Sequence, residues 1–288
     1  MTLGSTRSLR DLVARLLPGE DDTVDLAEAA FDGNRTLDAN TLLALGLERQ
    51  PFPEQTAPEA LFVDHAVEMQ VNTLADQLRS GEMVPLLKGE AGSGKTSLLI
   101  QLMTRHARDY HFFVVRGEAS LTAQRTIIDM LRVLVRPVPE DLSECFRELA
   151  RQLRSVVADD CPAVLVIDDA DALGDDELNH LLAAHDSLKA ALGGRFRILL
   201  AASSRFELRI ANLQSRQIDA GRIVATAVRP MQRARVGPYM LQRLEAAGLD
   251  GESPLDGEDL DRIAEAGEGL PRVLEAAAAS LLNQRFGD

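Results

Sequence analysis

The chain has no tryptophan, only two tyrosines and only two cysteines among its 288 residues. So few aromatic rings argue against a stacking platform for single-stranded nucleic acid. The cysteines, Cys145 and Cys161, form no CxxC pair and fit ordinary thiols in a reducing compartment. No apolar run approaches the roughly 18 residues that span a bilayer, and the N-terminus lacks the apolar core of a signal peptide. We therefore expect a cytoplasmic chain without a transmembrane segment.

Two enzyme signatures are also missing. The five histidines stand in no HExxH or similar ligand spacing, so the sequence does not predict a zinc site. There is no GxSxG segment, which leaves a serine hydrolase without support.

Positive charge is scarce. The chain carries 31 lysines and arginines against 45 acidic residues, a net charge of −14. This balance argues against DNA or RNA as the main ligand. Only three residues are lysines, Lys88, Lys95 and Lys189, so a lysine in a recognisable loop carries more information here than it usually does.

The hydrophobic pattern predicts an α/β fold. Five short apolar segments alternate with helical patterns, which is typical of a parallel sheet covered on both faces; they are 84–88, 112–115, 164–167, 197–201 and 222–226. After Pro230 the pattern is helical only. We expect an N-terminal helical extension (1–40), a central α/β domain (41–229) and a small helical subdomain (230–288). The extension has two readings: it docks a partner, or it covers the chain's own core.

A glycine-rich segment follows the first of these strands and matches GxxxxGK[ST]. Its glycines let consecutive backbone N–H groups surround a phosphate chain, and the following helix adds the positive end of its dipole. Lys95 can reach the β- and γ-phosphates, and the Thr96 hydroxyl can bind Mg²⁺. The sequence thus predicts an ATP–Mg²⁺ site formed by Gly89, Glu90, Ala91, Gly92, Ser93, Gly94, Lys95, Thr96 and Ser97.

Polar residues end two further strands. Asp168 and Asp169 follow the third strand, at the sheet edge where the glycine loop also begins. We expect Asp168 to hold Mg²⁺ and Asp169 to orient or deprotonate the attacking water. Ser203 and Ser204 follow the fourth strand, where one of them can contact the γ-phosphate or the water; the alternative is an ordinary strand-end serine.

Together these residues resemble the AAA+ ATPases over roughly residues 40–288. The resemblance includes Gly269-Leu-Pro-Arg272, similar to a lid motif whose arginine reaches the γ-phosphate. Leu45-Gly-Leu, Pro51-Phe52 and Pro58 to His65 look like the opening of ExeA/GspA-type ATPases, to which the DamX module is related and TniB/TnsC-type ATPases more distantly so. That group implies a cytoplasmic ATPase whose nucleotide cycle assembles or remodels a protein partner, for example one at the inner membrane.

The resemblance also implies a homo-oligomer in which an arginine of the neighbouring subunit completes the site. Arg205, Arg209, Arg216 and Arg222 lie between the fourth and fifth strands, and we favour Arg216 or Arg222 for this role. Asp169 departs from the family's usual glutamate, so hydrolysis can be slow. A slow ATP/ADP switch that acts through its N-terminal helix is therefore the alternative, and a DNA-linked, transposition-type ATPase is the third reading.

Overall fold

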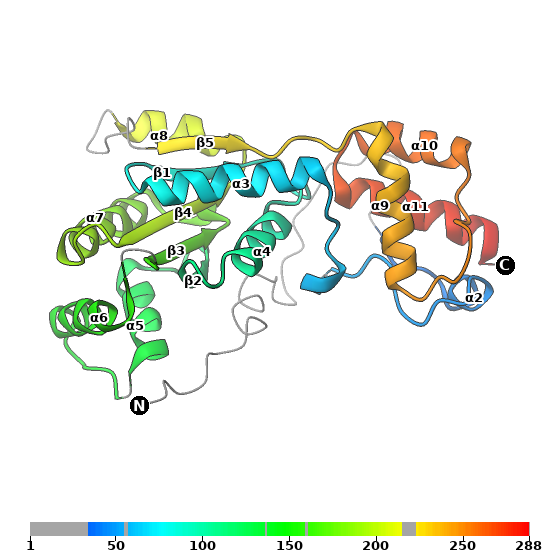
Figure 1. The fold of residues 1–288 in the computed structure, drawn as a ribbon. Coiled ribbons are helices and arrows are strands. Elements are labelled where there is room, and N and C mark those ends of the chain that lie inside the picture. Colours follow the sequence, from blue (N-terminus) through cyan, green and yellow to red (C-terminus); the bar gives the residue numbers. More distant parts are fainter. Residues whose placement is uncertain (1–33, 55–56, 136, 159–160, 215–222, 288) are drawn as a thin grey trace. The chain divides into compact units, whose positions relative to one another are not determined.

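The computed structural model describes residues 34–54, 57–135, 137–158, 161–214 and 223–287 (Figure 1). The helices expected within residues 1–33 lie outside this part. The described residues form two compact units. A sheet unit comprises residues 69–89 and 98–227, and a helical unit comprises residues 34–68, 90–97 and 228–287.

The sheet unit contains one parallel five-stranded sheet, as the sequence predicts. Its strand order is β2-β3-β4-β1-β5. The strands are β1 (Val84–Lys88), β2 (His111–Arg116), β3 (Ala163–Asp168), β4 (Phe196–Ala202) and β5 (Ile223–Ala227). Arg116 pairs with Asp168 and Lys88 with Ala202, so the carboxyl ends of the first four strands meet along one edge.

The core on one side of the sheet consists of alternate strand residues and four helices. Strand residues Leu165, Ile167 and Leu200 belong to the same buried cluster as Leu131, Leu149 and Leu181 from the helices. The helices are α5 (Ala123–Leu134), α6 (Leu142–Val156), α7 (Asp175–Ala191) and α8 (Phe206–Gln214). Every residue of β3 is buried, as expected for a parallel strand covered on both faces.

Two further helices, α3 (His65–Ser80) and α4 (Lys95–Arg105), also supply buried leucines. The C-terminus of α3 is held by two cations: Lys189 Nζ donates to the Gly81 carbonyl at 2.7 Å, and Arg197 Nε donates to the Leu78 carbonyl at 3.2 Å. Burial lowers the pKa of Arg197. Cations at this position complement the negative end of the helix dipole.

The helical unit packs short helices around a second core (Figure 1). Its elements are α2 (Ala39–Ala44), η1 (Pro58–Ala60), α9 (Arg233–Ala246), α10 (Gly257–Gly267) and α11 (Pro271–Phe286). Inside this core Glu275 accepts hydrogen bonds from Tyr239 at 2.6 Å and from Arg35 at 2.9 Å. Burial and the Glu275 charge raise the pKa of Tyr239 well above its ordinary value.

Helix α7 begins at Asp175, with Gly174 as its N-cap. Helix α8 is absent from the sequence prediction. Among the described residues, no helix is long and apolar enough to cross a membrane.

Candidate nucleotide site

The glycine loop begins where β1 ends. The Gly89 N–H donates to the Ala202 carbonyl at 3.1 Å, which fixes the start of the loop beside the end of β4. The Glu90 carbonyl then accepts from the Ser93 N–H at 3.1 Å and from Lys95 Nζ at 3.1 Å. These two bonds fold the loop back on itself and hold the Lys95 ammonium at its mouth.

Two glycines of the loop adopt left-handed backbone conformations. Gly92 has φ +76° and Gly94 has φ +95°, values that a residue with a Cβ adopts only at a cost. Helix α4 starts directly afterwards at Lys95, and the N–H groups of a first helical turn point out of the helix end. The loop therefore has the backbone that the phosphate-binding prediction requires.

The Ser93 hydroxyl is an orphan among the described residues. Its oxygen is buried and has no hydrogen-bond partner in the protein. Because a buried polar atom without a partner is costly, this hydroxyl fits a site that a ligand oxygen completes. The loop thus suits a nucleotide phosphate on backbone and side-chain grounds.

The start of α11 lies against the same loop, within the helical unit. The Arg272 N–H donates to the Gly92 carbonyl at 3.3 Å. A Cβ added to Gly92 would come within 2.7 Å of the Arg272 Cβ. Gly92 is therefore needed twice, for its left-handed backbone and for the close approach of α11.

The acidic strand end belongs to the sheet unit. Asp168 is only 1% exposed; its Oδ1 accepts from the Asp169 N–H at 3.0 Å, and its carbonyl accepts from the Gly117 N–H at 2.7 Å. Asp169 is left-handed, with φ 52° and ψ 41°. Asp tolerates this region better than most residues with a side chain. A tight turn follows, in which the Ala172 N–H donates to the Asp169 carbonyl at 2.9 Å.

Arg116 is a site residue that the sequence analysis did not single out. It ends β2, and its Nε donates to Asp169 Oδ2 at 3.0 Å. The sequence signal for Arg116 was its position as the charged last residue of an apolar strand. Only the pairing of β2 with β3 connects it to Asp169. The second acid is therefore held by a guanidinium on the neighbouring strand.

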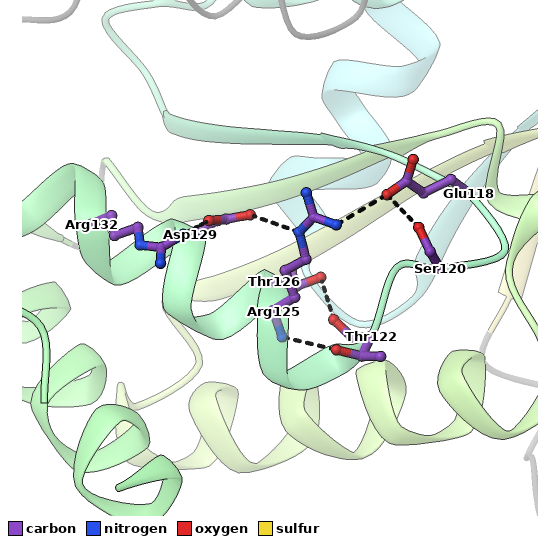
Figure 2. Close-up of polar contacts among 7 residues, drawn as sticks. All are labelled: Glu118, Ser120, Thr122, Arg125, Thr126, Asp129 and Arg132. Atoms are coloured by element: carbon purple, nitrogen blue, oxygen red, sulfur yellow. Dashed lines mark hydrogen bonds and ion pairs between the residues drawn. The ribbon is translucent and has the colours of Figure 1, made fainter. Parts of the chain in front are cut away.

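The segment after Arg116 is fastened to α5, as Figure 2 shows. Glu118 accepts from Ser120 Oγ at 2.7 Å and from Arg125 at 3.3 Å. Thr122 caps α5 by accepting from the Arg125 N–H at 3.1 Å. These contacts join the chain that leaves β2 to the first turn of α5.

Of the remaining predicted residues, the structure describes the two serines but not the two favoured arginines. Ser203 is half-buried, Ser204 is exposed, and the Ser203 carbonyl accepts from the Phe206 N–H at 3.1 Å at the start of α8. Arg216 and Arg222 lie outside the described residues. Arg209, another arginine of this segment, bonds to the turn after β3 of its own chain.

A magnesium site built from side chains alone is absent from the described part of the chain, which has no group of three His, Cys, Asp or Glu suited to a metal. Mg²⁺ commonly keeps several waters and binds one or two carboxylates together with substrate phosphates. The Asp168 carboxylate in the sheet unit is an oxygen donor of this kind, and so is the Thr96 hydroxyl in the helical unit. By its chemistry each suits Mg²⁺ that arrives with a nucleotide.

Comparison with known families finds a match over the segment that carries these residues. The AAA domain family matches residues 75–210, a segment that contains the glycine loop and the acidic strand end. The parallel sheet of order 2-3-4-1-5, followed by C-terminal helices, is the α/β fold of AAA+ proteins. None of the curated proteins compared with the chain matches it.

Three solved structures illustrate the fold. Cdc6p from Pyrobaculum aerophilum is 20% identical, with a TM-score of 0.56, and the match covers 81% of this chain and 67% of that one. The ORC1 protein of Aeropyrum pernix in complex with DNA is 17% identical, with a TM-score of 0.55 and coverages of 79% and 64%. The ORC2 protein of Aeropyrum pernix, in ADPNP–ADP complexes, is 17% identical, with a TM-score of 0.58 and coverages of 83% and 68%. At these identities the likeness is one of fold.

Proposed function

We propose that this protein is an AAA+ ATPase that binds ATP with Mg²⁺, hydrolyses it and uses the cycle to assemble or remodel a protein partner. The observation that carries the proposal is the glycine loop. Its left-handed glycines, its helix start at Lys95 and its orphan Ser93 hydroxyl suit a phosphate chain. The match of residues 75–210 to the AAA domain family supports it independently.

In this proposal the glycine loop binds the nucleotide, and residues at the strand ends take part in its hydrolysis. Lys95 leaves the Glu90 carbonyl and donates to the β- and γ-phosphates, while the Ser93 hydroxyl donates to a phosphate oxygen. Thr96 and Asp168 hold Mg²⁺, which neutralises charge on the phosphates when bound. Asp169 orients the water and takes its proton, and Ser203 or Ser204 contacts the γ-phosphate or the water.

Asp169 and Arg116 govern the rate. The Oδ2 atom of Asp169 accepts a hydrogen bond from Arg116 Nε, so this oxygen must be released before it can contact the water. The proposed enzyme is therefore slow while this pair is intact. A slow ATP/ADP switch is the limiting case of the same site.

Assembly and lid motion complete the proposed cycle. Arg272, at the start of α11, contacts the γ-phosphate and so senses which nucleotide is bound. The backbone hydrogen bond from Arg272 to Gly92 supports a role at the loop. Subunits assemble side by side, and Arg216 or Arg222 of one copy completes the site of the next. The partner is a protein, cytoplasmic or peripheral to the inner membrane, as the ExeA-type resemblance implies.

The direct test is nucleotide binding and phosphate release with Lys95→Ala. Losing a charge-assisted bond worth about 1.5–3 kcal/mol weakens ATP binding by roughly 10–100-fold. Lys189→Ala is the matched control, since it also removes a lysine but one that bonds Gly81 at the end of α3. Equal affinity in the wild-type protein and Lys95→Ala would refute the proposed site.

Assembly is tested by light scattering with ADP–Mg²⁺ and with ATP–Mg²⁺. We expect a larger species with ATP only, and none in Lys95→Ala. A monomer in every state would contradict the assembly, and the monomeric switch would replace it.

Nucleic acid is the competing partner. ORC1 of Aeropyrum pernix is described in complex with DNA, but that likeness is one of fold, and the net charge of −14 opposes binding to a phosphate backbone. A filter-binding assay at moderate salt decides. Tight retention of duplex DNA that depends on ATP would overturn the choice of a protein partner.

A further inference from the structure

Arg209 of α8 has an unusual set of partners within the sheet unit. Its Nη1 donates to the Asp171 carbonyl at 2.9 Å, its Nη2 to the Leu173 carbonyl at 2.5 Å, and its Nε to Asp175 Oδ1 at 2.6 Å. Two of the acceptors lie in the connection between β3 and α7, and the third belongs to Asp175, the first residue of α7. One planar guanidinium thus spans most of the turn that follows the two acids.

This turn sets the backbone of Asp169. It contains the 3₁₀ helix η2 (Ala170–Ala172), whose N-cap is the left-handed Asp169. The Ala172 N–H closes the turn on the Asp169 carbonyl at 2.9 Å, and the Leu173 N–H donates to the Ala170 carbonyl at 3.3 Å. The left-handed Asp169 thus stands at the start of a turn that two backbone hydrogen bonds close.

Helix α8 is itself firmly placed. Phe206 is 1% exposed, and the Arg209 guanidinium lies 5.7 Å from the centre of its ring. One residue along, Glu207 forms an ion pair with Lys88, the last residue of β1. The arginine therefore reaches the turn from a helix that is anchored both to the core and to the neighbouring strand.

We propose that Arg209 is a positioning residue for the acidic strand end: by holding the Asp171 and Leu173 carbonyls it keeps Asp169 in the left-handed conformation that directs its carboxylate. This inference rests on the proposed ATPase function. It removes Arg209 from the arginines that serve a neighbouring subunit, because its donors are engaged within its own chain. A guanidinium is needed here because its planar set of N–H donors reaches all three acceptors at once, which the single ammonium of a lysine cannot do.

The test compares Arg209→Gln and Arg209→Lys with Leu208→Ala, an adjacent change at a side chain that is 70% exposed. Hydrogen exchange of the Ala172 and Leu173 amides is measured without nucleotide, and kcat and KM for ATP are measured well below each variant's Tm. We expect both Arg209 variants to speed exchange in the turn by about 10-fold or more. Because misplacing a reacting group by about 1 Å can cost roughly 100-fold, we expect kcat to fall at least 10-fold while KM changes less than two-fold.

Asp175→Asn is the second variant, because it weakens one contact and leaves both carbonyl bonds. It should slow kcat less than Arg209→Gln does. Unchanged exchange in the turn, equal effects on kcat and KM, or full rescue by lysine would overturn the positioning role. If the wild-type protein hydrolyses no ATP, the ATPase proposal fails, and the exchange measurement alone still decides whether Arg209 holds the turn.

Discussion

The Nε of Arg116 lies 3.0 Å from Oδ2 of Asp169 and joins the ends of two adjacent parallel strands. Asp169 is the residue expected to act on water, so the availability of its Oδ2 atom and the direction of its carboxylate both depend on this partner. The pair is partly exposed, and such pairs are worth at most about 1 kcal/mol. Breaking it therefore costs little free energy.

Arg116→Gln should therefore raise the rate of hydrolysis. Freeing the Asp169 carboxylate removes up to about 1 kcal/mol of ground-state stabilisation, which corresponds to about a fivefold gain in kcat, with an unchanged KM. Steady-state phosphate release measures both constants. Arg125→Gln is the control, since it breaks only the contact with Glu118 further along the same segment (Figure 2). A fall in kcat would mean that Arg116 holds Asp169 in its productive direction.

Asp169→Glu tests the length of this side chain. Glutamate tolerates a left-handed backbone less well than aspartate, so we expect a lower Tm and slower hydrolysis, with ATP binding kept. Asp169→Asn retains the backbone preference but not the base, and should keep the Tm while losing most of the hydrolysis. Thermal melts and phosphate release distinguish the two effects. Faster hydrolysis in Asp169→Glu would instead identify a site slowed by its missing methylene.

Gly92→Ala should weaken nucleotide binding strongly. The new Cβ would meet the Arg272 Cβ at 2.7 Å and would sit on a backbone with φ +76°, so both the loop and the start of α11 must shift. Titration with a fluorescent ATP analogue measures the affinity. Gly193→Ala provides the comparison, because Gly193 is also left-handed, at φ +60°, but a Cβ there meets only one atom, at 3.9 Å. If Tm fell by the same amount in both variants and both bound nucleotide equally well, the close approach of Gly92 to Arg272 would have no role in nucleotide binding.

Asp64 gives a pH dependence with a defined sign. Burial raises its pKa, but the Val67 N–H and the Arg235 side chain outweigh this and hold the pKa below 3.8. A depressed pKa in the folded state contributes stability above the unfolded value, and this stability is lost as the pH falls through the folded value.

Asp64→Asn should therefore lower the Tm at pH 7 and converge with the wild-type protein below about pH 4. Asparagine still caps a helix, so the Val67 N–H at the start of α3 keeps an acceptor, while the ion pair with Arg235 is lost. Melts across pH 2.5–7, as an approximate range around this transition, are the measurement. A Tm difference that stays constant over this range would show that Arg235 adds no stability through the ionised carboxylate.

Local sequence determined much of this protein. The strands are short, apolar runs, and the helices show a repeat of 3.6, so both are visible within windows of a few residues. The glycine loop is also local: the spacing from Gly89 to Thr96 alone predicts a loop that can wrap a phosphate chain and the helix that starts at Lys95, whereas the left-handed backbone of Gly92 and Gly94 is seen in the structure. The acids at 168 and 169 follow from their place at the end of an apolar strand.

Tertiary structure decided which groups meet these local features. Arg116 reaches Asp169 only because β2 pairs with β3, and Arg209 reaches the turn after β3 from a helix that follows β4. The backbone bond from Arg272 to Gly92 joins residues 180 positions apart in the chain. The sequence pattern predicts that each strand is buried but not which strand lies beside it, because any apolar strand can pair with another. Strand order and helix packing therefore determine which residues contact Asp169, the turn after β3 and the glycine loop.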